Sequence, residues 1–113
     1  MSCLFCNIVA KKIPADVVYE DEHVLAFRDI RPVAPAHVLV VPREHIAYTH
    51  ELEPEHVTVM GQLMLASRKV AEELGLVESG YRLVVNDGPA AGQTVFHIHL
   101  HVLGGRGFTW PPG

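Results

Sequence analysis

Hydrophobic positions recur with two different periods along the 113-residue chain. Within residues 54–74 they recur every three or four residues, which is the spacing of one face of an α-helix. Pro54 suits a first helical turn and Gly75 is a natural stop, so we predict one long helix over residues 54–74. The predicted apolar face comprises Val57, Met60, Leu63, Met64, Ser67, Val70, Ala71 and Leu74.

Short segments rich in β-branched residues predict strands. These segments are residues 17–20, 24–28, 38–41, 81–86 and 94–103. Residues 4–9 have apolar positions compatible with a short helix that ends before Pro14. Short loops join the elements, which predicts an α+β fold with an antiparallel sheet of about five strands, one long helix and one short helix. No repeat or linker divides the sequence, so we expect residues 1–113 to form a single domain.

The chain has 9 Lys and Arg against 13 Asp and Glu, a formal net charge of −4. Binding to nucleic acid polymers usually needs a basic surface, which this composition does not supply. We find no secretory signal and no apolar run of the roughly 20 residues that a membrane span needs. Two cysteines do not make a disulfide framework. We therefore expect a cytoplasmic protein that binds neither nucleic acid polymers nor membranes.

His97, His99 and His101 alternate with apolar residues over 97–103. Side chains alternate across a strand, so the three imidazoles should share one face, roughly 7 Å apart, while the apolar side chains pack on the long helix. Three readings follow: a solvated polar face, a three-histidine metal cage, or covalent catalysis. Covalent catalysis is favoured, since no further metal ligand stands beside the three and imidazole is a good nucleophile toward phosphorus.

A turn over residues 87–93 precedes this strand, and its backbone N–H groups could approach phosphate oxygens at Gly88 and Gly92. It is not a Walker loop, because the two glycines are too close and no Lys-Ser/Thr follows. His50-Glu51 does not start a metalloprotease motif either, because residue 54 is proline rather than histidine.

The pattern His-φ-His-φ-His-φ-φ at residues 97–103 resembles the signature of the histidine-triad superfamily. The resemblance covers nearly the whole chain. It includes Phe27-Arg28-Asp29-Ile30, Ala34-Pro35-Ala36-His37, Val40-Val41-Pro42, Gly92-Gln93-Thr94 and the C-terminal Trp110-Pro111-Pro112-Gly113. The Leu-Gly-Gly-Arg after the triad and the C-terminal tail look most like the nucleoside phosphoramidase (Hint) branch.

The resemblance implies hydrolysis of purine nucleoside phosphoramidates through a nucleotidyl-histidine intermediate. His99 would be the nucleophile, with His97 and His101 orienting it and balancing charge. Thr94 stands where the family commonly has serine and would donate a hydrogen bond to the phosphate or the leaving group. The resemblance also implies a homodimer in which two sheets join into one, with each tail reaching toward the partner's site.

The same resemblance assigns the nucleotide contacts. Asn86, Gly92 and Gln93 would line the phosphate side, and His37 would support the triad. Asp29 would bind the ribose hydroxyls, since a carboxylate is an acceptor-only group. The base would lie between Phe5, Ile8, Ile30 and Leu39, all of which could equally be ordinary core residues.

Cys3 and Cys6 have the Cys-x-x-Cys spacing of many zinc sites, although a short helix could equally bury two thiols. The phosphoramidase branch in its familiar form lacks this pair. Other triad proteins with such a pair resemble zinc binders completed by two histidines, which here would be His45 and His97. We expect structural zinc at these four residues and no organic cofactor.

Three alternative functions stay open. A dinucleoside polyphosphate hydrolase would use the same triad. A nucleotide-binding interaction protein would keep the pocket without turnover, although an intact triad argues against it. A zinc-storage or sensor protein would need more than one zinc per chain.

Overall fold

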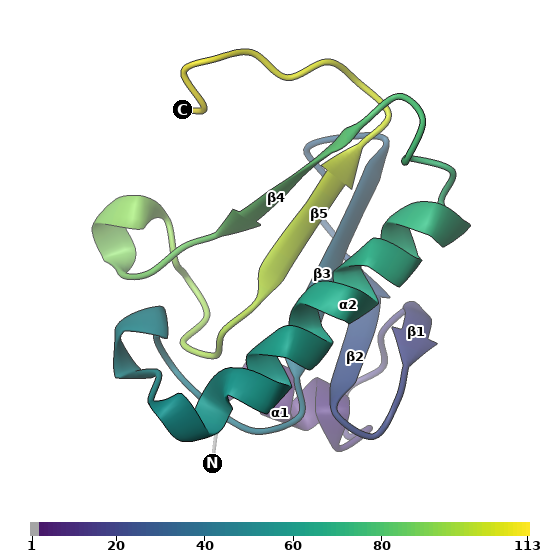
Figure 1. Ribbon diagram of the computed structural model, residues 1–113. Helices are drawn as coiled ribbons and strands as arrows, with labels where there is room; N and C mark the ends of the chain where they lie inside the picture. Colours follow the sequence, from purple (N-terminus) through teal and green to yellow (C-terminus); the bar gives the residue numbers. More distant parts are fainter. Residues whose placement is uncertain (1–2) are drawn as a thin grey trace.

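The computed structural model describes residues 3–113 and contains a sheet of five strands, all paired antiparallel, in the order β1-β2-β3-β5-β4 (Figure 1). The strands are β1 (Val17–Glu20), β2 (Val24–Arg28), β3 (Ala36–Pro42), β4 (Tyr81–Val85) and β5 (Leu100–Gly104). The helices are α1 (Leu4–Val9) and α2 (Val57–Glu73), with short 3₁₀ turns at Thr49–Glu51, Pro54–His56 and Pro89–Ala91. The predicted α+β fold with one long and one short helix is confirmed.

The alternation of side chains along β2 and β3 gives the sheet two apolar faces. On one face Val24, Ala26, Val38, Val40, Leu100 and Val102 pack with the buried side of α2. On the other face Leu25, Phe27, Leu39 and Val41 pack with Phe5 and Ile8 of α1. Figure 1 shows α2 crossing one face, with α1 behind the sheet. Residues of β5 that alternate with Leu100 and Val102 therefore face the side on which α1 lies.

The strand predicted over residues 94–103 begins only at Leu100. Its ladder with β3 runs from Gly104 opposite Ala36 to Leu100 opposite Val40. Before that point the chain turns to a different partner, because the Ile98 N–H donates to the Ile46 carbonyl at 2.7 Å. His97, in a bend, and His99 thus precede β5, and only His101 lies within the strand.

The predicted helix over residues 54–74 is a 3₁₀ turn at Pro54–His56 followed by α2. Its predicted apolar face is partly wrong. Leu63, Ser67, Val70 and Ala71 are buried together with Ala66, whereas Val57 is 72% and Met64 53% exposed. An amphipathic stripe marks where apolar residues recur, and packing against a twisted sheet decides which of them are covered.

Among the described residues no helix is long and apolar enough to cross a membrane.

Candidate active site and metal site

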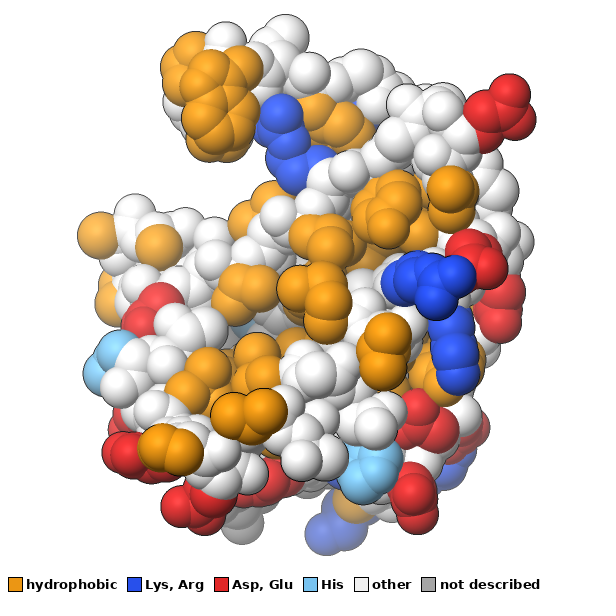
Figure 2. Space-filling model, viewed as in Figure 1, with side chains coloured by type: hydrophobic (Ala, Val, Ile, Leu, Met, Phe, Trp, Pro, Cys, Tyr) orange, Lys and Arg blue, Asp and Glu red, His pale blue; other side chains and the backbone are white. Residues whose placement is uncertain are grey.

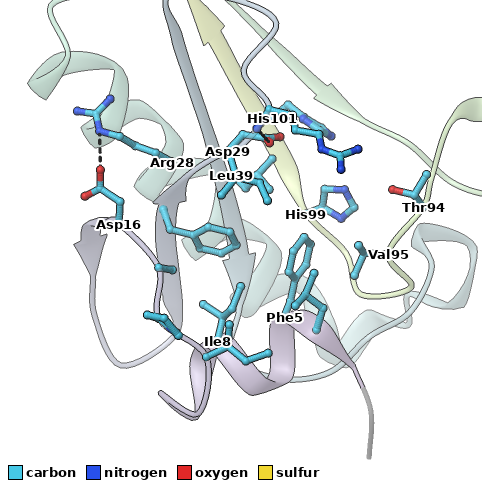
Figure 3. Close-up of a pocket in the computed structure, with 17 residues that line it drawn as sticks. Phe5, Ile8, Asp16, Arg28, Asp29, Leu39, Thr94, Val95, His99 and His101 are labelled. Carbon is cyan, nitrogen blue, oxygen red and sulfur yellow. Dashed lines mark hydrogen bonds and ion pairs between the residues drawn. The ribbon is translucent and has the colours of Figure 1, made fainter.

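A cavity of about 660 Å³ opens on the face of the sheet where α1 lies (Figure 3). Its walls come from α1, β2, β3 and the segment leading into β5, so residues far apart in sequence meet there. Four predicted base contacts line it: Phe5, Ile8 and Leu39 are buried, and Ile30 is 92% exposed at the rim. The remaining lining residues are Leu4, Ile13, Pro14, Ala15, Asp16, Phe27, Arg28, Asp29, Arg31, Thr94, Val95, His99 and His101.

The hydrogen bonds of His99 fix which ring nitrogen carries its proton. Its Nδ1 lies 2.8 Å from the carbonyl oxygen of His97, and a carbonyl can only accept, so Nδ1 carries the hydrogen. The Nε2 lone pair is then free, which is the form in which imidazole acts as a nucleophile. The edge of the Phe5 ring packs on this imidazole, with ring centroids 5.0 Å apart.

His101 is linked to His37 by a second fixed pattern. The Val33 N–H donates to Nδ1 of His37 at 3.1 Å, so the proton of neutral His37 is on Nε2. That Nε2–H donates to Nδ1 of His101 at 2.9 Å, which places the proton of neutral His101 on Nε2. The His99 and His101 rings are 5.0 Å apart, closer than the 7 Å expected from strand geometry, because the side chains lean together.

Burial keeps these imidazoles neutral. Loss of hydration lowers the pKa of His99, and it does the same for His37. For His101, burial and the neighbouring His99 and His37 lower the pKa to about 4. At neutral pH the imidazoles of His37, His99 and His101 are therefore uncharged, and their hydrogen bonds set which nitrogen of each ring donates and which accepts.

The Asp29 carboxylate lies between the cavity and the His37–His101 pair. Its Oδ2 is 3.3 Å from Nε2 of His37, and its Oδ1 accepts the Arg31 N–H at 2.8 Å. The carboxylate lines the main cavity and also a neighbouring one of about 390 Å³, which Asn86, Thr94 and His101 line as well. The two cavities therefore meet at the four residues that line both of them: Asp29, Arg31, Thr94 and His101.

Two residues predicted on the phosphate side line neither cavity. The side chain of Gln93 is buried: it donates to the carbonyls of Ala47 (2.8 Å) and Val95 (3.1 Å) and accepts the Gly88 N–H (2.8 Å). Gly92 adopts a positive φ of 99° beside the Asn86 amide. Both residues shape the loop that leads to Thr94 rather than presenting a side chain to the cavity.

A cluster of potential metal ligands lies next to the cavity. It consists of Cys3, Cys6, His45 and His97, whose ligand atoms all lie within 4.8 Å of one another. The His97 Nδ1 is 3.4 Å from Cys3 Sγ, 3.5 Å from Cys6 Sγ and 3.2 Å from His45 Nδ1. The four residues expected to hold zinc therefore meet in the structure. His97 lines neither cavity; its carbonyl accepts a hydrogen bond from His99, the next member of the triad.

The donor set of this cluster fits a metal ion. The His97 Nε2–H donates to the Pro42 carbonyl at 2.8 Å, so its Nδ1 lone pair points into the cluster. Around a tetrahedral zinc with bonds of about 2.0–2.3 Å, ligand atoms lie roughly 3.3–3.8 Å apart, close to the distances found here. Burial and the adjacent Cys3 thiol raise the pKa of Cys6 to about 11, so forming its thiolate costs free energy. A cation bound between the two sulfurs would offset that cost.

Asp29, His37 and His101 form a second group with metal-ligand spacing. Its hydrogen bonds argue against a metal. The Val33 N–H occupies Nδ1 of His37, so Nε2 keeps its proton and has no lone pair to offer. His97 and His37 both carry the proton on Nε2, but they turn different nitrogens toward their neighbours. His97 presents the Nδ1 lone pair to the thiols, whereas His37 presents a protonated Nε2 to His101 and Asp29.

Several lining residues of the main cavity were not predicted. Ile13, Pro14 and Ala15 follow α1, and in the sequence they predicted only the end of that helix. Arg28 and Asp16 form an ion pair at 3.4 Å on the rim, but a charged pair is also common on any surface. These residues form part of the cavity wall only because the segment after α1 packs next to β2 in the folded chain.

Comparison with known proteins supports the assignment of the fold. The family model described as "HIT domain" matches residues 10–108. A HIT family hydrolase from Legionella pneumophila has a solved structure with a TM-score of 0.97 and 50% identity, covering 99% of this chain and 100% of that one.

Two curated plant proteins are also similar. A "14 kDa zinc-binding protein" of Zea mays is 50% identical over 97% of this chain and 87% of its own length. "Adenylylsulfatase HINT1" of Arabidopsis thaliana is 46% identical over 97% of this chain and 76% of its own length. The agreement of sequence, fold and family model shows that this chain belongs to the HIT domain family.

Proposed function

We propose that this protein hydrolyses purine nucleoside phosphoramidates through a covalent nucleotidyl-His99 intermediate. The observation that carries the proposal is the bond from His99 Nδ1–H to the His97 carbonyl, which leaves the Nε2 lone pair free at the cavity. The names of similar proteins, a hydrolase and an adenylylsulfatase, support a reaction at phosphorus.

The reaction has two steps. In the first, His101 is protonated beside the bound anionic phosphate, His99 Nε2 attacks phosphorus, the P–N bond breaks, and the amine leaves with the proton from His101 Nε2, which returns His101 to the neutral form. In the second, water attacks the same phosphorus, the bond to His99 breaks, and the proton from water returns to His101. The products are a nucleoside monophosphate and a free amine. The Thr94 hydroxyl donates to the phosphate or to the leaving group.

The nucleoside occupies the larger cavity. Its base lies against Phe5, Ile8 and Leu39, and the exposed Ile30 folds over it. Asp29 accepts hydrogen bonds from the ribose hydroxyls. Asn86 lies beside the phosphate, while Gly92 and Gln93 hold the loop that presents Thr94.

The first test uses adenosine 5′-phosphoramidate and follows release of adenosine monophosphate (AMP). The parent protein should turn over, and His99→Ala should lose at least about a thousandfold in rate while still binding AMP, because removing the nucleophile leaves the pocket in place. Turnover that survives in His99→Ala would contradict the covalent mechanism. Binding of AMP without turnover by the parent would favour a nucleotide-binding interaction protein.

Adenylyl sulfate is a second candidate substrate, favoured by the name of the Arabidopsis relative. Sulfate is a stable anion and leaves without taking a proton, so its release should depend less on His101. Comparing kcat/KM for both substrates and a diadenosine polyphosphate ranks the leaving groups. A His101→Gln variant that loses more activity toward the phosphoramidate than toward adenylyl sulfate would support proton donation by His101.

We further propose that Cys3, Cys6, His45 and His97 hold one structural zinc, since four protein ligands leave no open position for a substrate. The maize relative named for zinc binding supports this site. Protein purified without chelators should contain about one zinc per chain, and Cys3→Ser/Cys6→Ser should contain little. Well under half a zinc per chain in the parent would contradict the proposal, and more than one would favour a storage or sensor role.

A homodimer is proposed from the open edge of the sheet. β4 is an edge strand, and its free backbone groups can pair with a second copy. Figure 2 shows hydrophobic side chains across the middle of the face that α2 presents, with acidic side chains along its margins. The exposed apolar residues of α2 are Val57, Met64 and Leu65. Trp110 in the C-terminal tail is 82% exposed, and we propose that it contacts the second copy in the dimer.

A further inference from the structure

α1 belongs to both proposed sites at once. Cys3 precedes the helix and Cys6 lies within it, and both sulfurs point into the metal cluster. Phe5 lies between these cysteines in sequence and lines the nucleotide cavity, and its ring also packs against that of His97 with centroids 6.0 Å apart. One turn later Ile8 lines the same cavity. The two cysteine ligands and part of the wall of the base pocket therefore belong to the same short helical segment.

The helix has little to hold it apart from these two sides. It has only 6 residues, and isolated helices of that length are not stable in water. Its backbone forms no ladder with the sheet, so it is anchored by the apolar contacts of Phe5 and Ile8 with β2 and β3 and by the thiols against His45 and His97. Loss of the second anchor leaves α1 held by the apolar contacts of Phe5 and Ile8, two residues that also line the cavity.

The Phe5 ring also reaches the nucleophile. Its centroid is 5.0 Å from that of His99 and 5.5 Å from that of Phe27, both edge-to-face. The ring is only 4% exposed, so a displaced α1 would open the cavity wall and release one side of His99 together.

We propose that metal bound at Cys3, Cys6, His45 and His97 raises nucleotide affinity by holding α1 in place as the wall of the base pocket. The inference rests on the proposed function, because it needs both a nucleotide in the larger cavity and an ion in the thiol cluster. Metal and nucleotide then select the same docked position of α1, so each strengthens the binding of the other by the same factor.

The direct test measures the Kd of AMP by calorimetry with zinc-loaded protein and with chelator-treated protein. If α1 is docked for about a tenth of the time without metal, AMP should bind about tenfold more weakly, and added zinc should restore the affinity. The reciprocal measurement uses chelator competition: saturating AMP should raise zinc affinity by the same factor. Hydrogen exchange should show faster exchange at residues 4–9 in metal-free protein, with β3 and β5 still protected.

Two variants separate metal binding from the pocket. His45→Ala removes a ligand that is exposed and lines neither cavity; its AMP affinity should fall at limiting zinc and recover at high zinc. Phe5→Ala keeps all four ligands, so zinc should still bind while AMP affinity becomes largely independent of zinc.

Equal AMP affinity with and without metal would overturn this inference while leaving the proposed hydrolase intact. So would loss of protection throughout β3 and β5 in metal-free protein, because the effect would then be global unfolding. AMP that binds neither form would refute the nucleotide site and this inference together.

Discussion

Hydrogen bonds to the backbone assign different tasks to chemically identical histidines. The Pro42 carbonyl turns the His97 lone pair toward the thiols, and the His97 carbonyl turns the His99 lone pair toward the cavity. The Val33 N–H keeps a proton on His37 Nε2, which is directed at His101. A ring nitrogen that faces a carbonyl must donate, so each task follows from one neighbouring main-chain atom.

The neutral state of His101 gives a pH prediction. Its pKa is about 4, mainly because of burial, against about 6.5 when unfolded, so between these values the unfolded chain binds more protons. Stability should therefore be fully present above about pH 6.5 and fall as the pH drops toward 4. Protonation linked to His101 should lower the free energy of unfolding by on the order of 2 kcal/mol between neutral pH and pH 4, once partial solvent screening is allowed for.

Urea unfolding between pH 4 and 7.5 checks this prediction. His101→Gln should have a shallower pH dependence than the parent, whatever its absolute stability, because one of the groups that protonate only after unfolding is gone. An unchanged slope in the variant would show that His101 does not contribute.

At the scale of elements, the end of β5 explains the glycine pair that follows the triad. Gly105 has a φ of +87°, and a Cβ there would lie 2.9 Å from the Cβ of Pro35. At Gly104 a Cβ would lie 2.6 Å from a Leu76 methyl. Both positions let the chain turn sharply where the segments around Pro35 and Leu76 converge on β5.

Gly105→Ala should lower the free energy of unfolding by about 1–3 kcal/mol, because it combines a left-handed backbone with a contact to a rigid proline ring. Gly107→Ala is the matched control: nothing lies within 4 Å of its Cβ position, so its stability should stay close to the parent's. Thermal unfolding of the two variants compares them directly. Equal loss in both would point to chain flexibility rather than to the turn.

At the scale of the whole molecule, β4 leaves one edge of the sheet open, and the proposed dimer closes it. Size-exclusion chromatography with light scattering should give a mass of about twice the 12.5 kDa of one chain. Val85→Lys should shift the protein toward monomer, since a lysine on an edge strand discourages pairing. Val85 is 40% exposed at the end of β4.

Val77→Lys provides the comparison for that variant. Val77 is 56% exposed but lies outside the strands, so the same charge there should leave the dimer intact. Dissociation by both lysines would indicate a general charge effect, and a parent that elutes as a monomer would contradict the dimer itself.

Periodicity predicted the two helices and the five strands of this fold, although not all of their bounds. The 3.6-residue spacing around Leu63 and Val70 indicated α2, and β-branched runs such as residues 38–41 indicated buried strands, because burial of one face imposes these periods. The alternation at residues 97–101 also pointed to the candidate reactive segment, since residue type and spacing are properties of the chain alone.

Tertiary structure decided what periodicity could not. The strand predicted from Thr94 begins only at Leu100, because Ile98 pairs with Ile46 instead of β3. The apolar positions Val57 and Met64 are exposed, because the sheet covers only part of the α2 stripe. The side chain of Gln93 holds a loop, because its partners are main-chain groups brought close only in the fold.

The class of fold, the triad and the Cys-x-x-Cys pair can thus be read from the amino-acid sequence, since they depend on residue types at fixed spacing. The separation of His97 from His99 and His101, and the position of α1 between two sites, were decided only by the tertiary structure. Hydrogen-bond direction depends on atoms from distant parts of the chain, and no local pattern records which of them will meet.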